Sequence, residues 1–274
     1  MKVSKKSKSS SSKLSYGYCK VSIAAMRKDP SHTSEMVSQL LFGEHFTVTD
    51  LNSNDTWAKI KNSYDHYEGW LHKKQFTLIP KSTFKQIEES ELHLSVEMQS
   101  ALIIEPEKTV IPILAGSHLP NLQKGKLTIE GKTYCFRGKS RTHENSPNRK
   151  KIIQTAFEFL HAPYLWGGRS EFGIDCSGFS QLVYKLNGVK IPRDAYQQAE
   201  IGTELDFVEA SEPGDLAFFD NEQGKITHVG IILSPELIIH ASGTVHVDDF
   251  DLKGINCKET KKYSHHLRTI RRYF

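Results

Sequence analysis

A helix that begins at a cysteine and is followed by two histidine-containing strands is the main feature of this 274-residue chain. Apolar side chains recur at helical spacing across residues 179–186, and Asn187-Gly188 supplies a stop signal. Cys176 therefore falls in the first turn of this helix. Residues 226–233 and 237–243 are rich in β-branched side chains and predict two strands. This order of elements predicts an α+β unit.

The position of Cys176 suits a nucleophile. The first turn of a helix has unpaired N–H groups and the positive end of the helix dipole, which lower the pKa of a thiol. Asp175 is expected to cap this turn, and the backbone N–H of Cys176 to face a developing oxyanion. The alternative is a buried structural thiol, because free cysteine is among the most buried residue types.

The two histidines are expected to lie on one face of a hairpin. His228 and His240 belong to strands that the short turn Ser234-Pro235-Glu236 connects. With the turn centred on Pro235, Gly230 faces His240, and the two histidines become diagonal neighbours roughly 7–8 Å apart at the backbone. This is the arrangement that a general base and its orienting partner require. A slip of one residue would send them to opposite faces.

Two histidines are also consistent with a metal site. No carboxylate or second cysteine is evident at ligand spacing, and Cys257 is isolated. We therefore expect no metal and no organic cofactor.

Six short blocks in the second half of the chain resemble the NlpC-type (NlpC/p60) cell-wall peptidases, which have a papain-like core. The blocks follow the order found in that family. They occupy residues 163–168, 175–179, 191–194, 213–219, 227–230 and 239–241.

The resemblance implies a cysteine peptidase mechanism. It implies Cys176 as the nucleophile, His228 as the base and His240 as the residue that orients the base. It also implies that the Tyr164 hydroxyl and the Cys176 amide hold the oxyanion, with Ser177 contacting the substrate and Asp175 beside it.

The chain is expected to contain more than one domain. Short strand signals separated by turns predict two small all-β barrels at 14–80 and 81–140, similar to the bacterial SH3-type domains that accompany NlpC-type peptidases. The peptidase is expected at 141–274, where Ser146-Pro147 begins a helix. The strand signals lie at 21–23, 44–48, 57–60, 69–71, 101–104, 111–114 and 133–136.

The formal charge of +4 is concentrated at the start of the chain. Residues 1–13 hold five lysines and no acidic residue, so the remainder nets to −1 (4 − 5). This Lys/Ser-rich segment is too polar to fold and is expected to be disordered. A basic surface for nucleic acid is not supported.

Localisation is expected to be cytoplasmic. The opening segment lacks the apolar core of a signal peptide, and four cysteines are too few for a disulfide framework. A periplasmic or extracellular location remains the alternative if a signal peptide is missing from this chain. No apolar stretch is long enough to span a membrane, and we expect a monomer.

The predicted order of domains resembles the subgroup that hydrolyses the bond between γ-D-glutamate and a diamino acid in murein peptides with a free N-terminal L-Ala. The resemblance implies that Glu35, Tyr67 and Asp194 recognise the substrate ammonium. Each has a structural alternative: a solvated acid, a barrel core residue and a helix cap, respectively. The family often has serine after the Arg-Asp pair, whereas this chain has Ala195.

Two other functions remain open. One is an N-acetylmuramoyl-L-alanine amidase or acyltransferase that uses the same nucleophile. The other is a non-catalytic wall-binding protein, which predicts a disrupted Cys/His/His set, and this set is complete here.

Overall fold

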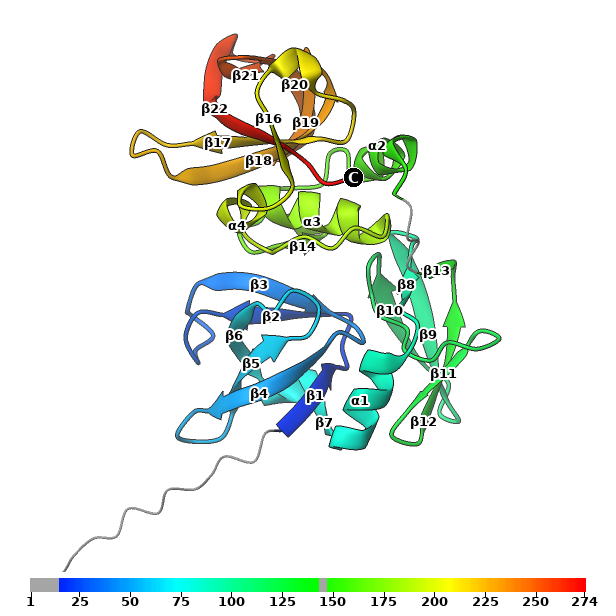
Figure 1. Cartoon of the computed structure of the whole chain (residues 1–274). Helices are drawn as coiled ribbons and strands as arrows, with labels where there is room; N and C mark the ends of the chain where they lie inside the picture. Colours follow the sequence, from blue (N-terminus) through cyan, green and yellow to red (C-terminus); the bar gives the residue numbers. More distant parts are fainter. Residues whose placement is uncertain (1–14, 143–146) are drawn as a thin grey trace, which may run out of the picture.

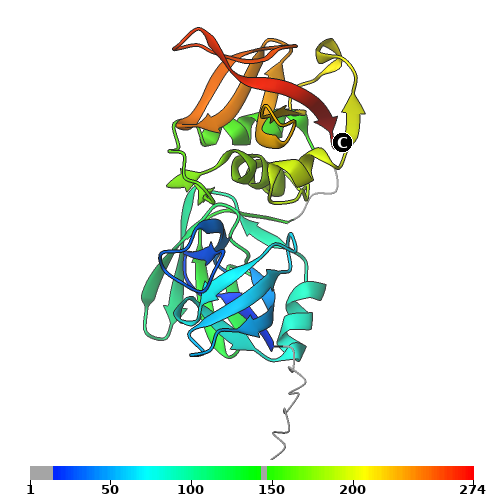
Figure 2. The ribbon, with the colours of Figure 1, turned by 90° about the vertical axis from the view of Figure 1, so that its left-hand side faces the viewer.

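The structure is a computed structural model that describes residues 15–142 and 147–274. It consists of a peptidase region stacked on two N-terminal regions (Figure 1). The peptidase region lies above the two N-terminal regions in both views (Figure 1 and Figure 2), and these two regions lie side by side in Figure 1 and share one hydrophobic core. The tail predicted at 1–13 lies outside the described residues, as does Ser146 at the predicted helix start. Within the described ranges, no helix is long and apolar enough to cross a membrane.

The first region is a seven-stranded antiparallel sheet, and we call it the barrel after the predicted SH3-type barrel. Alternating burial along its strands produces the barrel core, in which Leu40, Phe46, Ile60 and Leu71 are buried. The strand order is β3-β2-β6-β5-β4-β1-β7. The strands are β1 (Ser15–Cys19), β2 (Ile23–Arg27), β3 (Met36–Leu41), β4 (His45–Leu51), β5 (Trp57–Asn62), β6 (Glu68–His72) and β7 (Phe76–Ile79), with a short 3-10 helix at Lys73–Gln75.

The second region begins with a helix, α1 (Lys81–Glu89), in a range where the sequence analysis expected only a barrel. Phe84 and Ile87 lie one turn apart on α1 and are buried. They share one hydrophobic core with Phe42 of the first region and Tyr134 of the second. A four-stranded sheet of order β10-β9-β12-β11 and a separate β13-β8 pair complete the region. These strands are β8 (His93–Ser95), β9 (Gln99–Glu105), β10 (Thr109–Leu114), β11 (Lys126–Ile129), β12 (Lys132–Arg137) and β13 (Ser140–Thr142).

The peptidase region packs its helices against a second seven-stranded sheet, of order β16-β22-β17-β18-β19-β20-β21. Strand β21 also pairs with β22, so six of these strands close into a barrel. Phe179 and Val183 of α3 are fully buried in the core between helix and sheet. The helices are α2 (Arg149–Glu158), α3 (Cys176–Leu186) and α4 (Ala195–Ala199), with a 3-10 helix at Val208–Ala210. The strands are β14 (Arg169–Ser170), β15 (Gly173–Ile174), β16 (Thr203–Leu205), β17 (Leu216–Asp220), β18 (Ile226–Ser234), β19 (Leu237–Ser242), β20 (Thr244–Asp251), β21 (Gly254–Cys257) and β22 (Lys262–Arg272).

The predicted hairpin is confirmed, including its register. β18 and β19 pair antiparallel, and Gly230 lies opposite His240. A Cβ atom at Gly230 would stand 3.0 Å from the Cβ of His240 and 2.7 Å from Ile238, so glycine allows this close approach. The α+β fold class is likewise confirmed.

A buried ion triad joins the barrel to the peptidase. The Glu44 carboxylate accepts hydrogen bonds from the Arg169 guanidinium at 2.9 and 3.0 Å and from Lys185 Nζ at 2.7 Å. All three side chains are fully buried. Although burial acts to raise it, the charges of Arg169 and Lys185 hold the pKa of Glu44 below its usual range. This triad places the barrel in a defined position against α3.

Candidate active site

A cleft of about 490 Å³ lies between the first barrel and the peptidase region. Cys176 lines it from the peptidase side, and Glu35 and Tyr67 line it from the barrel. The structure thus brings to one cavity residues that are more than a hundred positions apart in the sequence. The other lining residues are Val37, Tyr164, Trp166, Asp175, Ser177, Asp194, Ala195, Tyr196, Asn221, Lys225, Ile226 and Thr227.

Helix α3 begins at Cys176, as predicted. Asp175 is its N-cap, and the Asp175 carboxylate accepts a hydrogen bond from the Gly178 amide at 2.6 Å. Since amides in the first turn have no partner within the helix, the Cys176 N–H is free to stabilise an oxyanion. The backbone amide of Val229, the residue after His228, lies within hydrogen-bonding reach of the Cys176 sulfur.

The prediction of a lowered thiol pKa is wrong for the free protein. Burial, followed by the negative charge of Asp175, raises the pKa of Cys176 to about 12. The Cys176 side chain is only 6% exposed, so the lost solvation of a thiolate outweighs the helix terminus. At neutral pH the thiol therefore keeps its proton until a base removes it.

The predicted base and its orienting partner are in direct contact. Nε2 of His228 lies 2.9 Å from Nδ1 of His240, and both side chains are buried. Nε2 of His240 in turn lies 3.2 Å from Oδ2 of Asp248, a residue of β20 that the sequence analysis did not single out. Although burial acts to raise it, hydrogen bonds from His240 and from the Lys258 amide hold the pKa of Asp248 at about 2.

This chain of contacts determines the position of each proton. An ionised carboxylate only accepts hydrogen bonds, so Nε2 of His240 carries the proton that faces Asp248. Nδ1 of His240 then accepts the Nε2 proton of His228. Nδ1 of His228 is left with a free lone pair, which is what a general base for the Cys176 thiol needs. Among the described residues, no hydrogen bond joins the thiol to His228, and such contacts often close only when substrate binds.

Two further histidines surround the base. The His265 ring stacks on that of His228, with centroids 4.0 Å apart. His246 lies opposite His240 in the β19–β20 pairing, and its Nε2 is 3.1 Å from Oδ2 of Asp248. Burial first, then the neighbouring His265 and His240, hold the pKa of His228 well below its ordinary value. His228 is therefore neutral at pH 7 and able to take a proton.

The oxyanion and substrate residues predicted beside Cys176 are present in the cleft. Tyr164 lines it, and burial followed by the proximity of Cys176 raises the pKa of the Tyr164 hydroxyl, which therefore stays a hydrogen-bond donor. The oxygens of Asp175 and Ser177 are already engaged by Arg193: its guanidinium donates to the Asp175 carboxylate at 2.7 and 3.0 Å and to Ser177 Oγ at 2.9 Å. Arg193, which the sequence analysis did not assign, thus fixes the residues on both sides of the nucleophile.

The three residues predicted to recognise an ammonium group also line the cleft. The Tyr67 hydroxyl hydrogen-bonds to the Asp194 carboxylate. Asp194 is the N-cap of α4, which is the structural role expected for it as the alternative to substrate binding. Asp194 also lines the cleft. Glu35 is more exposed; its Oε1 accepts a hydrogen bond from Trp166 Nε1 at 2.9 Å, and its Oε2 lies 3.5 Å from Lys28.

A carboxylate does lie beside the two histidines, contrary to the expectation from the sequence. No carboxylate stands at ligand spacing along the chain, but β20 brings Asp248 to His240. His246 joins them, and one ligand atom of each residue lies within 4.8 Å of the others. The alternation His246-Val247-Asp248 on a strand was the available signal, because residues two apart share a face.

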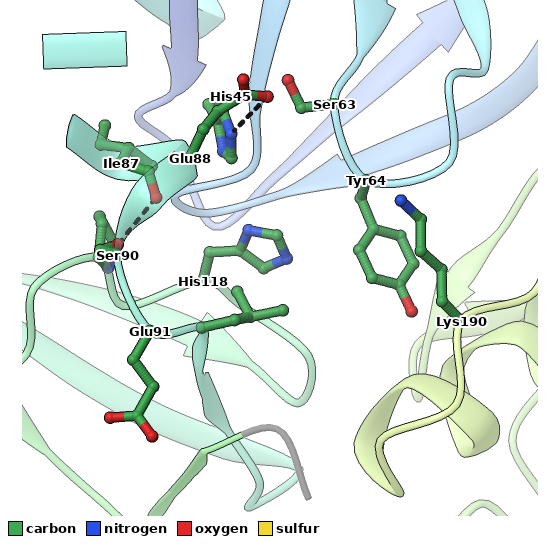
Figure 3. Close-up of a pocket in the computed structure, with 11 residues that line it drawn as sticks. His45, Ser63, Tyr64, Ile87, Glu88, Ser90, Glu91, His118 and Lys190 are labelled. Atoms are coloured by element: carbon green, nitrogen blue, oxygen red, sulfur yellow. Dashed lines mark hydrogen bonds and ion pairs between the residues drawn. The ribbon is translucent and has the colours of Figure 1, made fainter. Parts of the chain in front are cut away.

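A larger cavity, of about 630 Å³, lies at the junction of the two N-terminal regions with the peptidase (Figure 3). His45 and His118 line it, and burial lowers the pKa of both side chains. Its lining residues include no cysteine, whereas Cys176 lines the smaller cleft, which is therefore the candidate active site.

Comparison with known proteins agrees with this geometry. Residues 161–269 match the NlpC/P60 family, and residues 26–76 match the bacterial dipeptidyl-peptidase SH3 domain. The chain is 31% identical over 241 residues to the gamma-D-glutamyl-L-lysine dipeptidyl-peptidase of Bacillus cereus, covering 77% of this chain and 68% of that protein. It is 32% identical over 233 residues to the Bacillus subtilis enzyme of the same name, covering 76% and 72%.

The fold has a solved counterpart. The crystal structure of an NlpC/P60 family protein from Bacillus cereus superposes with a TM-score of 0.80 at 23% identity, covering 94% of this chain and 99% of that chain. With two relatives above 30% identity over more than two thirds of their length, this chain belongs to the NlpC/P60 family of cysteine peptidases and has a bacterial SH3-type region ahead of the peptidase domain.

Proposed function

We propose that this protein hydrolyses the amide bond between γ-D-glutamate and the following diamino acid in murein peptides with a free N-terminal L-Ala. The observation that carries the proposal is the position of Cys176 in a cleft that the acidic Glu35 and Asp194 enter from two different domains. The two Bacillus relatives, named for a γ-D-glutamyl-L-lysine bond, support the same reaction class.

The chemistry needs only residues of the chain. Nδ1 of His228 takes the thiol proton as Sγ of Cys176 attacks the amide carbonyl carbon. The Cys176 amide and the Tyr164 hydroxyl stabilise the oxyanion. The imidazolium of His228, stabilised by His240, then protonates the leaving amine as the C–N bond breaks. A water molecule that gives its proton to His228 hydrolyses the thioester, and the thiol is restored.

Selection of a free N-terminus follows from charge. The carboxylates of Glu35 and Asp194 and the Tyr67 hydroxyl offer acceptors to an ammonium group. A blocked amine would leave a partly buried carboxylate unpaired, which costs far more than a missing methylene group. Ala195, where the family often has serine, lines the same cleft and removes one hydroxyl from the substrate contacts.

The test is to incubate the protein with L-Ala-γ-D-Glu-meso-diaminopimelate, free and N-acetylated, and to identify the products by mass spectrometry. We expect release of L-Ala-D-Glu from the free peptide alone, and no release by Cys176→Ala. Equal cleavage of both peptides would overturn the proposed amine recognition. Cleavage of an N-acetylmuramoyl-L-alanine bond instead would establish the amidase, and no cleavage of any substrate would favour a wall-binding role. Replacing diaminopimelate by L-lysine identifies the preferred diamino acid.

We also propose that the protein acts as a monomer in a reducing compartment, the cytoplasm. The barrel of the same chain completes the cleft, so no second copy is needed. All four cysteines are free. Light scattering after size-exclusion chromatography tests the first point, and cell fractionation tests the second. A dimer, or recovery in the periplasmic or extracellular fraction, would contradict them.

A further inference from the structure

The residues behind the catalytic histidines form a set of three metal-ligating side chains. His240 Nε2 and His246 Nε2 lie 3.2 and 3.1 Å from Oδ2 of Asp248. Ligand atoms around a tetrahedral zinc ion with bonds of about 2.0–2.1 Å are separated by about 3.3 Å, which is close to these distances. Two imidazoles and one carboxylate with a fourth position open is also a known zinc ligand set.

Each of the three side chains is oriented by a second partner. Nδ1 of His240 is held by His228 at 2.9 Å, and Nδ1 of His246 donates to the Thr244 carbonyl at 2.8 Å. Oδ1 of Asp248 accepts from the Lys258 amide at 2.8 Å. Partners that fix the other atom of each ligand are typical of metal sites, because they set the tautomer and the ring direction.

Both ring nitrogens of His246 face acceptor oxygens. Nδ1 lies 2.8 Å from the Thr244 carbonyl, and Nε2 lies 3.1 Å from Oδ2 of Asp248. An N–H group on Nδ1 satisfies the carbonyl and leaves Nε2 available as a metal ligand. A metal ion bound by Nε2 and Oδ2 would take the place of a second proton between these two atoms.

Access is available from one side. The side chains of His240 and Asp248 are 1% and 3% exposed, whereas that of His246 is 31% exposed. An ion can therefore enter past His246 and reach ligands that are otherwise shielded from solvent.

We propose that His240, His246 and Asp248 form a binding site for a zinc ion and that zinc bound there switches the peptidase off. Imidazole ligands select zinc and similar transition metals over magnesium or calcium, which prefer sets of oxygen ligands.

The inhibition follows from proton positions. Zinc on His240 displaces the proton from Nε2, and neutral His240 then keeps its proton on Nδ1, where it faces His228. The proton in the hydrogen bond between the two histidines moves from Nε2 of His228 to Nδ1 of His240. The proton that zinc displaces from Nε2 of His240 is carried by solvent to Nδ1 of His228. The two imidazoles together therefore hold two protons before and after zinc binds. Nδ1 of His228 becomes a donor and no longer accepts the proton of Cys176.

The binding half of the proposal is independent of the proposed function and is tested first. Tag-free, full-length Cys176→Ala protein, which lacks the catalytic thiol, is titrated with Zn²⁺ by calorimetry and with Co²⁺ by absorption spectroscopy. We expect one ion per chain and no thiolate-to-cobalt band. His246→Gln in this background removes a ligand and should weaken binding by more than the about 10–100-fold that loss of a partner behind a ligand costs. His266→Gln, the same change at an exposed histidine on β22, is the matched control and should bind as the parent does.

Three results would overturn the site: no binding to Cys176→Ala, binding unaffected by His246→Gln, or a thiolate band that disappears with Cys257→Ser. If Cys176→Ala binds no zinc but zinc still inhibits the enzyme that has Cys176, the ion is bound by the catalytic thiol.

The inhibition half rests on the proposed function. Hydrolysis of the free peptide is followed at increasing Zn²⁺, with each variant normalised to its own rate in chelator. We expect at least about a tenfold loss of rate that EDTA reverses. The inhibitory concentration should rise by at least about 10–100-fold in His246→Gln and stay unchanged in His266→Gln. Binding without inhibition would refute the switch and leave the site in place. Absence of hydrolysis even in chelator would refute the proposed function instead.

Discussion

Oδ2 of Asp248 lies 3.2 Å from Nε2 of His240, directly behind the contact between His240 and His228. This carboxylate keeps the free lone pair of the base on the side of Cys176. We therefore expect the peptidase to depend on a residue that does not contact the thiol.

Asp248→Asn is expected to lower kcat of the metal-free enzyme by about 10²-fold or more, with KM little changed. An asparagine amide can donate to Nε2 of His240, which reverses the tautomer of both histidines, and in a serine protease triad the equivalent change costs about 10⁴-fold. Steady-state kinetics in chelator measure the effect. Asp249→Asn is the control, because Asp249 is half-exposed and forms an exposed ion pair with Lys258 at 3.4 Å. An Asp248→Asn enzyme with wild-type kcat would show that the tautomer is set elsewhere.

Alkylation of Cys176 by iodoacetamide in the free protein should become faster with rising pH and reach no plateau below about pH 10. The pKa of this thiol is raised to about 12, so the thiolate fraction grows throughout the range. Peptide mapping separates Cys176 from Cys257, whose pKa is lowered by contacts with Thr260 and which should react first. A plateau near neutral pH would instead indicate a stable thiolate–imidazolium pair.

Glu44→Gln is expected to reduce the free energy of unfolding by about 3–5 kcal/mol, because it leaves Arg169 and Lys185 buried without a counter-charge. Urea unfolding followed by circular dichroism gives the value. Glu68→Gln breaks an exposed pair with Lys59 and should change stability by less than about 1 kcal/mol. Similar values for both substitutions would mean that the triad contributes nothing to holding barrel and peptidase together.

Asp194→Asn should reduce the preference for a free over an N-acetylated peptide. Removing one partner of a partly buried charge pair costs about 2 kcal/mol or more, which is roughly thirty-fold in the ratio of the two kcat/KM values. Glu200→Gln, an exposed acid at the other end of α4, should leave the ratio unaltered. If the ratio is the same in Asp194→Asn, the amine is recognised elsewhere.

Elements set by local patterns were predicted correctly. Helix α3 starts at Cys176 because apolar residues at helical spacing follow a capping aspartate. The hairpin register that pairs Gly230 with His240 followed from the length of one turn. Helix α1 was missed, because 81–140 was assigned to a barrel from its strand signals. Phe84 and Ile87 are its only buried residues, and they owe their burial to a core shared by two regions.

The sequence by itself determined the fold class and the family resemblance and predicted the set of Cys176, His228 and His240, because each rests on residue patterns inside short segments. Only the tertiary structure decided the raised pKa of Cys176 and the place of Asp248 behind His240. It also decided the buried ion triad that Glu44 forms with Arg169 and Lys185 between the barrel and the peptidase. These depend on burial and on contacts between residues far apart in the chain. Periodicity predicts which face of an element is apolar, but it contains no information on how much solvent another domain removes from that face.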